Sequence, residues 1–290
     1  MTLIYATCDV GLYISKDSGN TWTLKLPGSN YTHVTCGLYG DVVAVIKSGE
    51  GIFVSNDGGN TWNKTLTSTS TMWTDIDCDY QCKNIVACMK GGSLYVSNDF
   101  GVTFKTRGLI TKWLSVTVDY YNGSIMYAGS ESYLYYSSTN GISWNLKATI
   151  PYFTKALYFA SLDCFDSGSD VFACVQRYTD NRSAVIRSTN SGVTWSTPDF
   201  NSNGTFCYGT SLVGVPGNPG GYVISTSSSV ATNSPGYTQT VGGAFKFILE
   251  LKGVTALWCS SDLKYIIYGK KQGGILYKSQ DNGLTFVALQ

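Results

Sequence analysis

The sequence predicts an all-β repeat fold, and three observations support this prediction. First, a pattern of the form S-x-D-x-G-x-T-W recurs in copies that start at residues 15, 55, 97, 137, 188, 232 and 279, of which the copy at 232 is the weakest. Second, the starts are 40 to 51 residues apart, which is a period typical of repeat architectures. Third, each copy follows a short run rich in β-branched and aromatic residues, such as 51–54, and no stretch predicts a helix longer than about one turn.

Each copy has the chemistry of a hairpin turn between two strands. Its Asp can accept hydrogen bonds from backbone N–H groups just ahead of it, and its Gly supplies a backbone conformation with positive φ. Thr suits the next strand, and the final aromatic residue offers a large apolar face for packing between sheets. We therefore predict structural roles for the aspartates and aromatic residues of the clearer copies: Asp17, Trp22, Asp57, Trp62, Asp99, Phe104, Trp144, Trp195, Asp281 and Phe286.

The repeated pattern resembles the Asp-box, or BNR repeat, of the sialidase-like β-propellers. The resemblance extends from Ser15 to Phe286 and implies a single β-propeller domain over residues 1–290. Similar boxes occur in sortilin-type receptors, xyloglucan hydrolases and photosystem II assembly factors. In such families the box joins the third and fourth strands of a blade and is not the active site. The resemblance therefore implies a fold and leaves the function open.

The repeat period predicts seven blades, taken in order along the chain. Residues 3–8, 11–15 and 21–26 form the second, third and fourth strands of a first blade that lacks its inner strand. Six complete blades follow, over about 31–66, 72–107, 113–149, 154–198, 205–242 and 247–290. Neither end of the sequence offers an evident strand for the first blade, so closure through a neighbouring subunit is an open alternative.

Composition excludes several classes of protein. The net charge is +1 and only 13% of residues are charged, so bulk charge does not favour nucleic acid as a partner. The longest apolar runs, such as 42–46, are too short to insert into a membrane. We see no signal peptide in the first residues and expect a soluble protein of a reducing compartment, either cytoplasmic or associated with a particle. The abundance of Gly, Ser, Thr, Asn and Tyr suits a virion or other particle component.

The nine cysteines are expected to be reduced core residues, because their number is odd and no signal peptide is visible. Repeat alignment places Cys36, Cys78 and Cys259 where Val118 lies in the first strand of another blade. Cys88 and Cys174 align in the second strand. Cys78 and Cys82 have a C-x3-C spacing but no second pair or nearby His, and His33 is the only histidine. We therefore predict no metal and no cofactor.

The sequence offers little support for catalysis. A sialidase needs an arginine triad, and the four arginines of this chain are absent from the first blades. Other glycosidases need two carboxylates across a cleft. Asp75, Asp77 and Asp79 alternate along one strand and turn, and 163–170 holds a second group, but we interpret both as strand ends and turn caps. The leading prediction is a non-enzymatic binding or assembly protein; the alternative is a glycoside hydrolase or lyase with an untypical site.

One loop is the predicted recognition site. The connection 176–182 between the second and third strands of the fifth blade is longer than a hairpin requires. Arg177 and Arg182 suit a carboxylate, sulfate or phosphate, and Tyr178 suits stacking on a sugar. Tyr152 and Phe153 come from the preceding connection on the same face, where we also expect an excess of basic residues. The predicted partner is a glycan or protein, with anionic character; a tolerated surface insertion is the competing interpretation.

Overall fold

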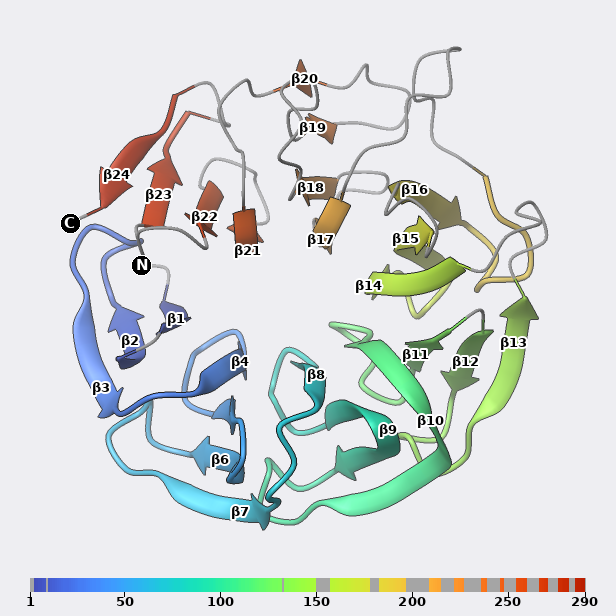
Figure 1. Ribbon diagram of the computed structural model, residues 1–290, viewed down its shortest axis with the longest axis horizontal. Helices are drawn as coiled ribbons and strands as arrows, with labels where there is room; N and C mark the ends of the chain where they lie inside the picture. Colours follow the sequence, from blue (N-terminus) through green and yellow to red (C-terminus); the bar gives the residue numbers. More distant parts are fainter. Residues whose placement is uncertain are drawn as a thin grey trace. The chain divides into compact units, whose positions relative to one another are not determined.

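The computed structural model describes residues 3–8, 10–131, 133–149, 157–177, 183–196, 209–214, 222–226, 236–238, 246–247, 254–259, 266–270, 276–281 and 285–289. All regular secondary structure in these residues is β-strand, which confirms the all-β prediction. Among the same residues no helix is long and apolar enough to cross a membrane. Figure 1 shows the strands as separate antiparallel sheets, each formed by consecutive segments of the chain.

The chain divides into two compact units, of which unit 1 comprises residues 1–130 and 134–147 and unit 2 comprises 131–133 and 148–290. The strands of the first three sheets are β1 (Ile4–Cys8), β2 (Gly11–Ser15), β3 (Thr23–Pro27), β4 (Tyr31–Cys36), β5 (Val43–Lys47), β6 (Gly51–Ser55), β7 (Asn63–Thr67), β8 (Trp73–Cys78), β9 (Ile85–Ser97), β10 (Lys105–Val118), β11 (Met126–Ser130), β12 (Tyr133–Ser137) and β13 (Asn145–Thr149). They pair as β1 to β3, β4 to β7 and β8 to β13, each in sequence order.

Unit 2 contributes three further sheets. Their strands are β14 (Leu157–Phe165), β15 (Asp170–Arg177), β16 (Ser183–Ser188), β17 (Gly209–Gly214), β18 (Tyr222–Thr226), β19 (Gly236–Thr238), β20 (Lys246–Phe247), β21 (Val254–Cys259), β22 (Ile266–Lys270), β23 (Leu276–Ser279) and β24 (Val287–Leu289). They pair as β14 to β16, β17 to β20 and β21 to β24. The predictions of one domain and of seven blades stay predictions.

The predicted third and fourth blades are joined by one long strand. β10 runs without a break from Lys105 to Val118; its first part pairs with β9 and its second part with β11. Within the predicted third blade, β9 also continues without a break through Gly91, whose φ is 77°. The sequence pattern placed a blade boundary between residues 107 and 113, and the backbone crosses that boundary as a strand.

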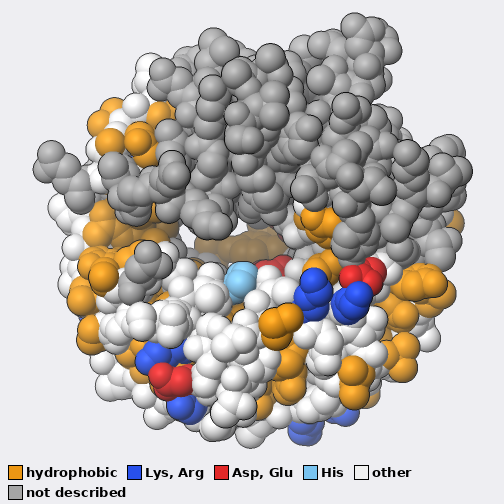
Figure 2. Space-filling view, in the orientation of Figure 1, with side chains coloured by type: hydrophobic (Ala, Val, Ile, Leu, Met, Phe, Trp, Pro, Cys, Tyr) orange, Lys and Arg blue, Asp and Glu red, His pale blue; other side chains and the backbone are white. Residues whose placement is uncertain are grey.

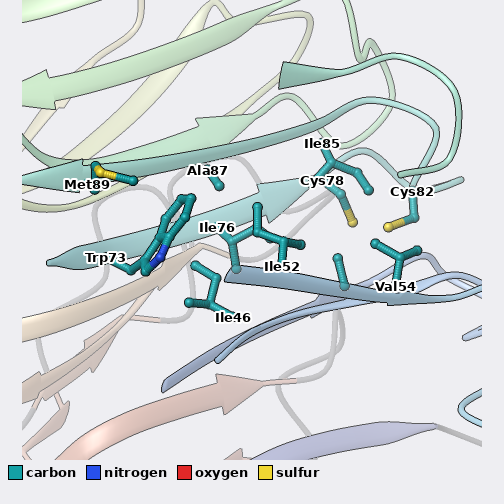
Figure 3. Close-up of a cluster of buried hydrophobic side chains, with 11 residues drawn as sticks. Ile46, Ile52, Val54, Trp73, Ile76, Cys78, Cys82, Ile85, Ala87 and Met89 are labelled. Atoms are coloured by element: carbon teal, nitrogen blue, oxygen red, sulfur yellow. The ribbon is translucent and has the colours of Figure 1, made fainter. Parts of the chain in front are cut away.

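The core of unit 1 lies between the faces of neighbouring sheets. Figure 3 shows Ile46, Ile52 and Val54 of β5 and β6 packed against side chains of β8 and β9. The alternate residues of β9, including Cys88, face the next part of the sheet and pack against Trp113. Because successive side chains of a strand point to opposite faces, β9 contributes to both clusters. A sheet covered on both faces explains why its strands are apolar at nearly every position.

The cysteine alignment is confirmed where the structure describes it. Cys36, Cys78 and Cys259 pair with the first residue of the next strand, as Val118 does. Cys88 and Cys174 both pair with inner-strand residues. Seven of the cysteines are free thiols: Cys8, Cys36, Cys78, Cys82, Cys88, Cys164 and Cys174.

Candidate functional site

The repeated turns are closed by hydrogen bonds within the pattern itself. In the second copy, Ser55 Oγ donates to Asp57 Oδ1 at 2.8 Å and accepts the N–H of Gly59 at 2.8 Å. Thr61 donates its N–H to Asp57 Oδ1 at 2.8 Å and its hydroxyl to Oδ2 at 2.6 Å. The copies at Asp17, Asp99 and Asp281 repeat the Ser–Asp and Thr–Asp bonds. Each of these four carboxylates therefore holds its turn together.

The two weaker copies keep the geometry with other side chains. Thr139 accepts the N–H of Ser143 at 3.0 Å, and Asn190 accepts the N–H of Thr194 at 2.8 Å. A hydroxyl or amide oxygen can thus replace the carboxylate, which indicates that the turn needs an acceptor rather than a charge. In the charged copies, the hydrogen bonds from Thr21 and Thr61 lower the pKa values of Asp17 and Asp57 to about 2.

The box aromatic residues close the turn from the other side. Trp62 donates its indole N–H to the carbonyl of Gly59 at 3.2 Å and is half-buried against a cluster that contains Leu12 of the preceding sheet. Trp144 and Trp195 make the same bond within their own turns. Trp22, Phe104 and Phe286 are also half-buried. The structure thus places the described box aromatics at packing positions.

Four of the boxes are also hydrogen-bonded to the turn between the first two strands of their own repeat. Gly58 donates its N–H to the carbonyl of Asp41 at 2.9 Å, and Phe100 donates to Lys83 at 3.1 Å. Asn140 and Ser191 make equivalent bonds in their sheets. The box turns and these first turns therefore lie at the same end of their sheets, as expected for strands that run up and down.

The carboxylates considered for catalysis are bonded to the backbone. Asp75 accepts the N–H of Ile76 at 2.9 Å and, through its other oxygen, the N–H of Val116 at 3.0 Å. Asp77 bonds Cys78 and Val118 in the same way, at 2.8 Å and 2.9 Å. Both aspartates link β8 to β10. The interpretation of these two residues as turn caps or strand ends was wrong.

Only the third aspartate of that group caps a turn. Asp79 accepts the N–H of Lys83 at 2.9 Å and an amide hydrogen of Asn84 at 2.7 Å. Burial is the main cause that raises the pKa of Asp75 to about 7 and that of Asp77 to about 6. In unit 2, Asp170 forms a two-bond ion pair with Arg187 at 2.8 Å and 2.7 Å.

His33 lies on β4, as predicted for an inner-strand residue. Burial lowers the pKa of its imidazole to about 4, so the ring is neutral near pH 7. Among the described residues no group of three or more His, Cys, Asp and Glu side chains could hold a metal ion.

Basic side chains on the described surface lie in small groups, several of them beside acidic ones. Figure 2 shows these blue groups and their red neighbours on one face of the molecule. One such group is Lys47, Glu50 and Lys64, whose ion pairs measure 2.7 Å and 3.0 Å. The described part of this face is therefore mixed in sign, and the expected excess of basic residues on the face of the Arg177 loop stays a prediction.

A group of tyrosines forms an exposed surface that the sequence argument missed. Tyr80, Tyr120 and Tyr121 pack with ring centroids 5.0 to 6.3 Å apart, and Tyr39 lies near Tyr120. We call these four residues the tyrosine surface. Tyr39 and Tyr121 are 68% and 65% exposed. Burial, followed by the neighbouring Tyr121, raises the pKa of Tyr120 to about 12, so its hydroxyl remains protonated.

The backbone holds the tyrosine surface in place. The N–H of Leu38 donates to the carbonyl of Tyr80 at 2.7 Å, and the N–H of Tyr80 donates to Tyr120 at 2.8 Å. Asp119, which is fully buried, accepts the N–H of Tyr121 at 3.1 Å. These bonds link three consecutive first turns. The sequence signal was present in the aligned repeats, because a tyrosine follows or closely follows the end of three inner strands in a row.

The predicted recognition patch falls largely outside the described residues. Arg177 ends β15, but its side chain is not described, and Tyr152, Phe153, Tyr178 and Arg182 lie outside the described ranges. The patch stays a prediction, and the tyrosine surface is a separate candidate on turns of unit 1.

Comparison with solved structures identifies the fold. No protein family and no curated protein matches the sequence. YCF48 from Cyanidioschyzon merolae matches with a TM-score of 0.62 at 12% identity, covering 99% of this chain and 88% of that one. YCF48 bound to D1 peptide matches with a TM-score of 0.61 at 12% identity, covering 89% of this chain and 81% of that one. An ancestral GH74 enzyme matches with a TM-score of 0.59 at 14% identity, covering 98% of this chain and 52% of that one.

The fold is a β-propeller. At such low identity the likeness concerns the fold alone, and this chain spans about half the length of the GH74 enzyme. Within the propeller, the tyrosine surface belongs to the turns between first and second strands, at the end of the sheets that also carries the box turns.

Proposed function

We propose that this β-propeller is a non-enzymatic binding or assembly protein that recognises a protein partner or a glycan. The observation that carries the proposal is the tyrosine surface. Tyrosine rings provide large, rigid, amphipathic contact area with few rotatable bonds, and aromatic residues are enriched at the centres of interfaces. Backbone bonds between Leu38, Tyr80 and Tyr120 fix the turns before any partner arrives, which reduces the entropy lost on binding.

Similar structures support a binding role without establishing it. One of the matched propellers is YCF48 bound to D1 peptide, so a propeller of this size can accommodate a peptide partner. In our proposal the tyrosine surface makes the apolar contacts, and the loop with Arg177, Tyr178 and Arg182 adds recognition of anionic groups. Assembly into a virion or other particle, within a reducing compartment, is a further part of the proposal.

The alternative is a glycoside hydrolase or lyase, and two observations favour it. One matched structure is an ancestral GH74 enzyme. In addition, burial raises the pKa of Asp75 to about 7, which suits a general acid near neutral pH. Against this, both oxygens of Asp75 accept backbone N–H bonds, and those of Asp77 do the same. A catalytic acid must instead reach the glycosidic oxygen.

A glycan array, a displayed peptide library and a panel of chromogenic glycosides test the two functions in parallel on the same purified protein. The proposal predicts saturable binding to an array or library member and no turnover of any glycoside. Turnover that disappears in Asp75→Asn would establish the enzymatic alternative. Absence of binding in both screens would contradict the recognition proposal.

A further inference from the structure

The first sheet of unit 1 has three strands where its neighbour has four. The register shows which positions are filled: Ile4 of β1 pairs with Ser15, which begins a box, as Val43 of β5 pairs with Ser55. The first residue of β11 and of β22, and the second residue of β15, likewise pair with the serine that begins a box. β1 is therefore a second strand. Among the described residues, no strand pairs with β1 on the edge that faces away from β2.

β1 is less buried than β5 and β11, the equivalent second strands of two other sheets. In β5, Val43, Ala44, Val45 and Ile46 are all fully buried, and β11 is buried along its whole length. In β1 only Ile4 is buried, and the four residues that follow are partly exposed. β5 and β11 have partners on both edges, whereas β1 pairs with β2 alone. An unpaired strand edge offers a row of N–H and C=O groups that can template another strand.

The neighbouring inner strands show what a strand at this position would contact. Asp75 and Asp77 of β8 accept the N–H groups of Val116 and Val118 on the next inner strand. Thr74 of β8 donates its hydroxyl to the carbonyl of Trp113 at 3.2 Å. Asp75 and Asp77, at alternate positions of one inner strand, thus present carboxylates to the backbone of the next inner strand, and Thr74 adds a hydroxyl contact.

β4 is the strand of the following sheet that lies next to β1. Its pairing register identifies the residues of β4 that correspond to Val116 and Val118 of β10. Cys36 pairs with Val43 as Val118 pairs with Met126, so Val34 and Cys36 correspond to Val116 and Val118. Val116 and Val118 are 2% and 3% exposed beneath β8. Val34 and Cys36 remain partly exposed.

We propose that the edge of β1 accepts an extended segment of a partner protein, which adds antiparallel to β1 and lies against β4. The segment alternates apolar residues with Thr or Asp, following the inner strands of this chain, of which 75–78 reads D-I-D-C. Main-chain hydrogen bonds to β1 supply affinity, and the alternate polar side chains supply specificity for β4. This proposal goes beyond the recognition function above, because it involves neither the tyrosine surface nor the Arg177 loop.

A peptide with the sequence of residues 72–79 and the change Cys78→Val is the first probe. Fluorescence polarisation of the labelled peptide with the full chain should give saturable binding, together with a rise in the unfolding midpoint of the protein. A control peptide carries N-methyl groups on alternate backbone nitrogens, which removes edge hydrogen bonds without changing its side chains. Equal binding of both peptides, or no saturable binding up to about 1 mM, would overturn the proposal.

Disulfide trapping tests the register directly. Cys8 of β1 corresponds to Met89 of β9, which pairs with Trp73. A peptide of residues 72–79 with Trp73→Cys and Cys78→Val, activated as a pyridyl disulfide, therefore places its sulfur opposite Cys8. The Cys8 thiolate attacks the peptide sulfur, forms a mixed disulfide and releases pyridine-2-thione.

Peptide mapping by mass spectrometry should locate the mixed disulfide on Cys8. The reaction should be at least about ten-fold slower when the peptide cysteine is moved by one residue, because that shift turns its side chain to the other face of the strand. A Cys8→Ser variant controls for reaction at other thiols. Equal modification by both peptides, or preferential modification of another cysteine, would contradict the strand-addition geometry.

Discussion

The box glycines should be needed for sheet packing as well as for backbone conformation, and two glycines of the same φ allow the two effects to be separated. Gly101 lies in a box and Gly91 lies within β9; both have φ of 77°. A Cβ on Gly101 would lie 2.8 Å and 2.9 Å from the Cγ atoms of Val54 and 3.2 Å from Ile85 Cδ1. A Cβ on Gly91 would meet nothing within 4 Å.

The expected magnitudes follow from these distances. Left-handed backbone costs a non-glycine residue about 1–2 kcal/mol, and this cost applies to both Gly91→Ala and Gly101→Ala. Overpacking against Val54 adds about 1–3 kcal/mol to Gly101→Ala alone. We therefore expect Gly101→Ala to lower the free energy of unfolding by about 2–5 kcal/mol, and Gly91→Ala by about 1–2 kcal/mol.

Urea unfolding, followed by tryptophan fluorescence, measures the difference between the two variants. The comparison requires that both variants keep the m value of the parent protein, so that a shift in the midpoint reports stability. Equal destabilisation of the two variants would refute the inference that box glycines pack against the preceding sheet.

Three further predictions concern protonation, thiols and the loop. Burial raises the pKa of Asp75 to about 7. The folded state therefore keeps a proton on this carboxyl that the unfolded state releases above about pH 4. The contribution of Asp75 to the free energy of unfolding is full below about pH 4 and is lost as the pH rises to about 7. Asp75→Asn should flatten this decline in urea midpoints measured from pH 4.5 to 7.5, and an unchanged profile would be inconsistent with the assigned pKa. Thiol titration under denaturing, non-reducing conditions should count at least the seven free cysteines of the described residues, and a count of five or fewer would indicate disulfides. Arg177→Ala with Arg182→Ala should weaken binding to an anionic ligand and reduce its salt dependence; unchanged affinity across a salt series would remove this loop from the proposed site.

The sequence predicted the features whose partners are close together in the chain. The turn at Asp57 was predictable because Ser55, Gly59 and Thr61 supply all its hydrogen bonds within a few residues. The same holds for the three strands of the first sheet, which match their predicted ranges to within two residues. Local chemistry fixes such elements, and repetition of the pattern made them recognisable.

The features that the sequence missed depend on contacts between repeats. Asp75 binds Val116, 41 residues further along the chain, and nothing near Asp75 indicates that partner. The tyrosine surface likewise requires three consecutive turns to be fastened together by backbone bonds, which carry no side-chain signature. The blade boundary before residue 113 coincides with the change of pairing partner along β10, but nothing in the sequence indicated that one strand would continue across it.

The most direct test of the central claim is the affinity of a tyrosine-surface variant for the best ligand from the array or library. The double variant Tyr39→Ala with Tyr121→Ala removes the two most exposed rings, and Tyr133→Ala, at 44% exposed and outside this surface, is the matched control. Calorimetric titration should show at least about ten-fold weaker binding for the double variant, equivalent to about 1.4 kcal/mol, and unchanged binding for the control. Parent-like affinity in a folded double variant would contradict the claim that the tyrosine surface recognises the partner.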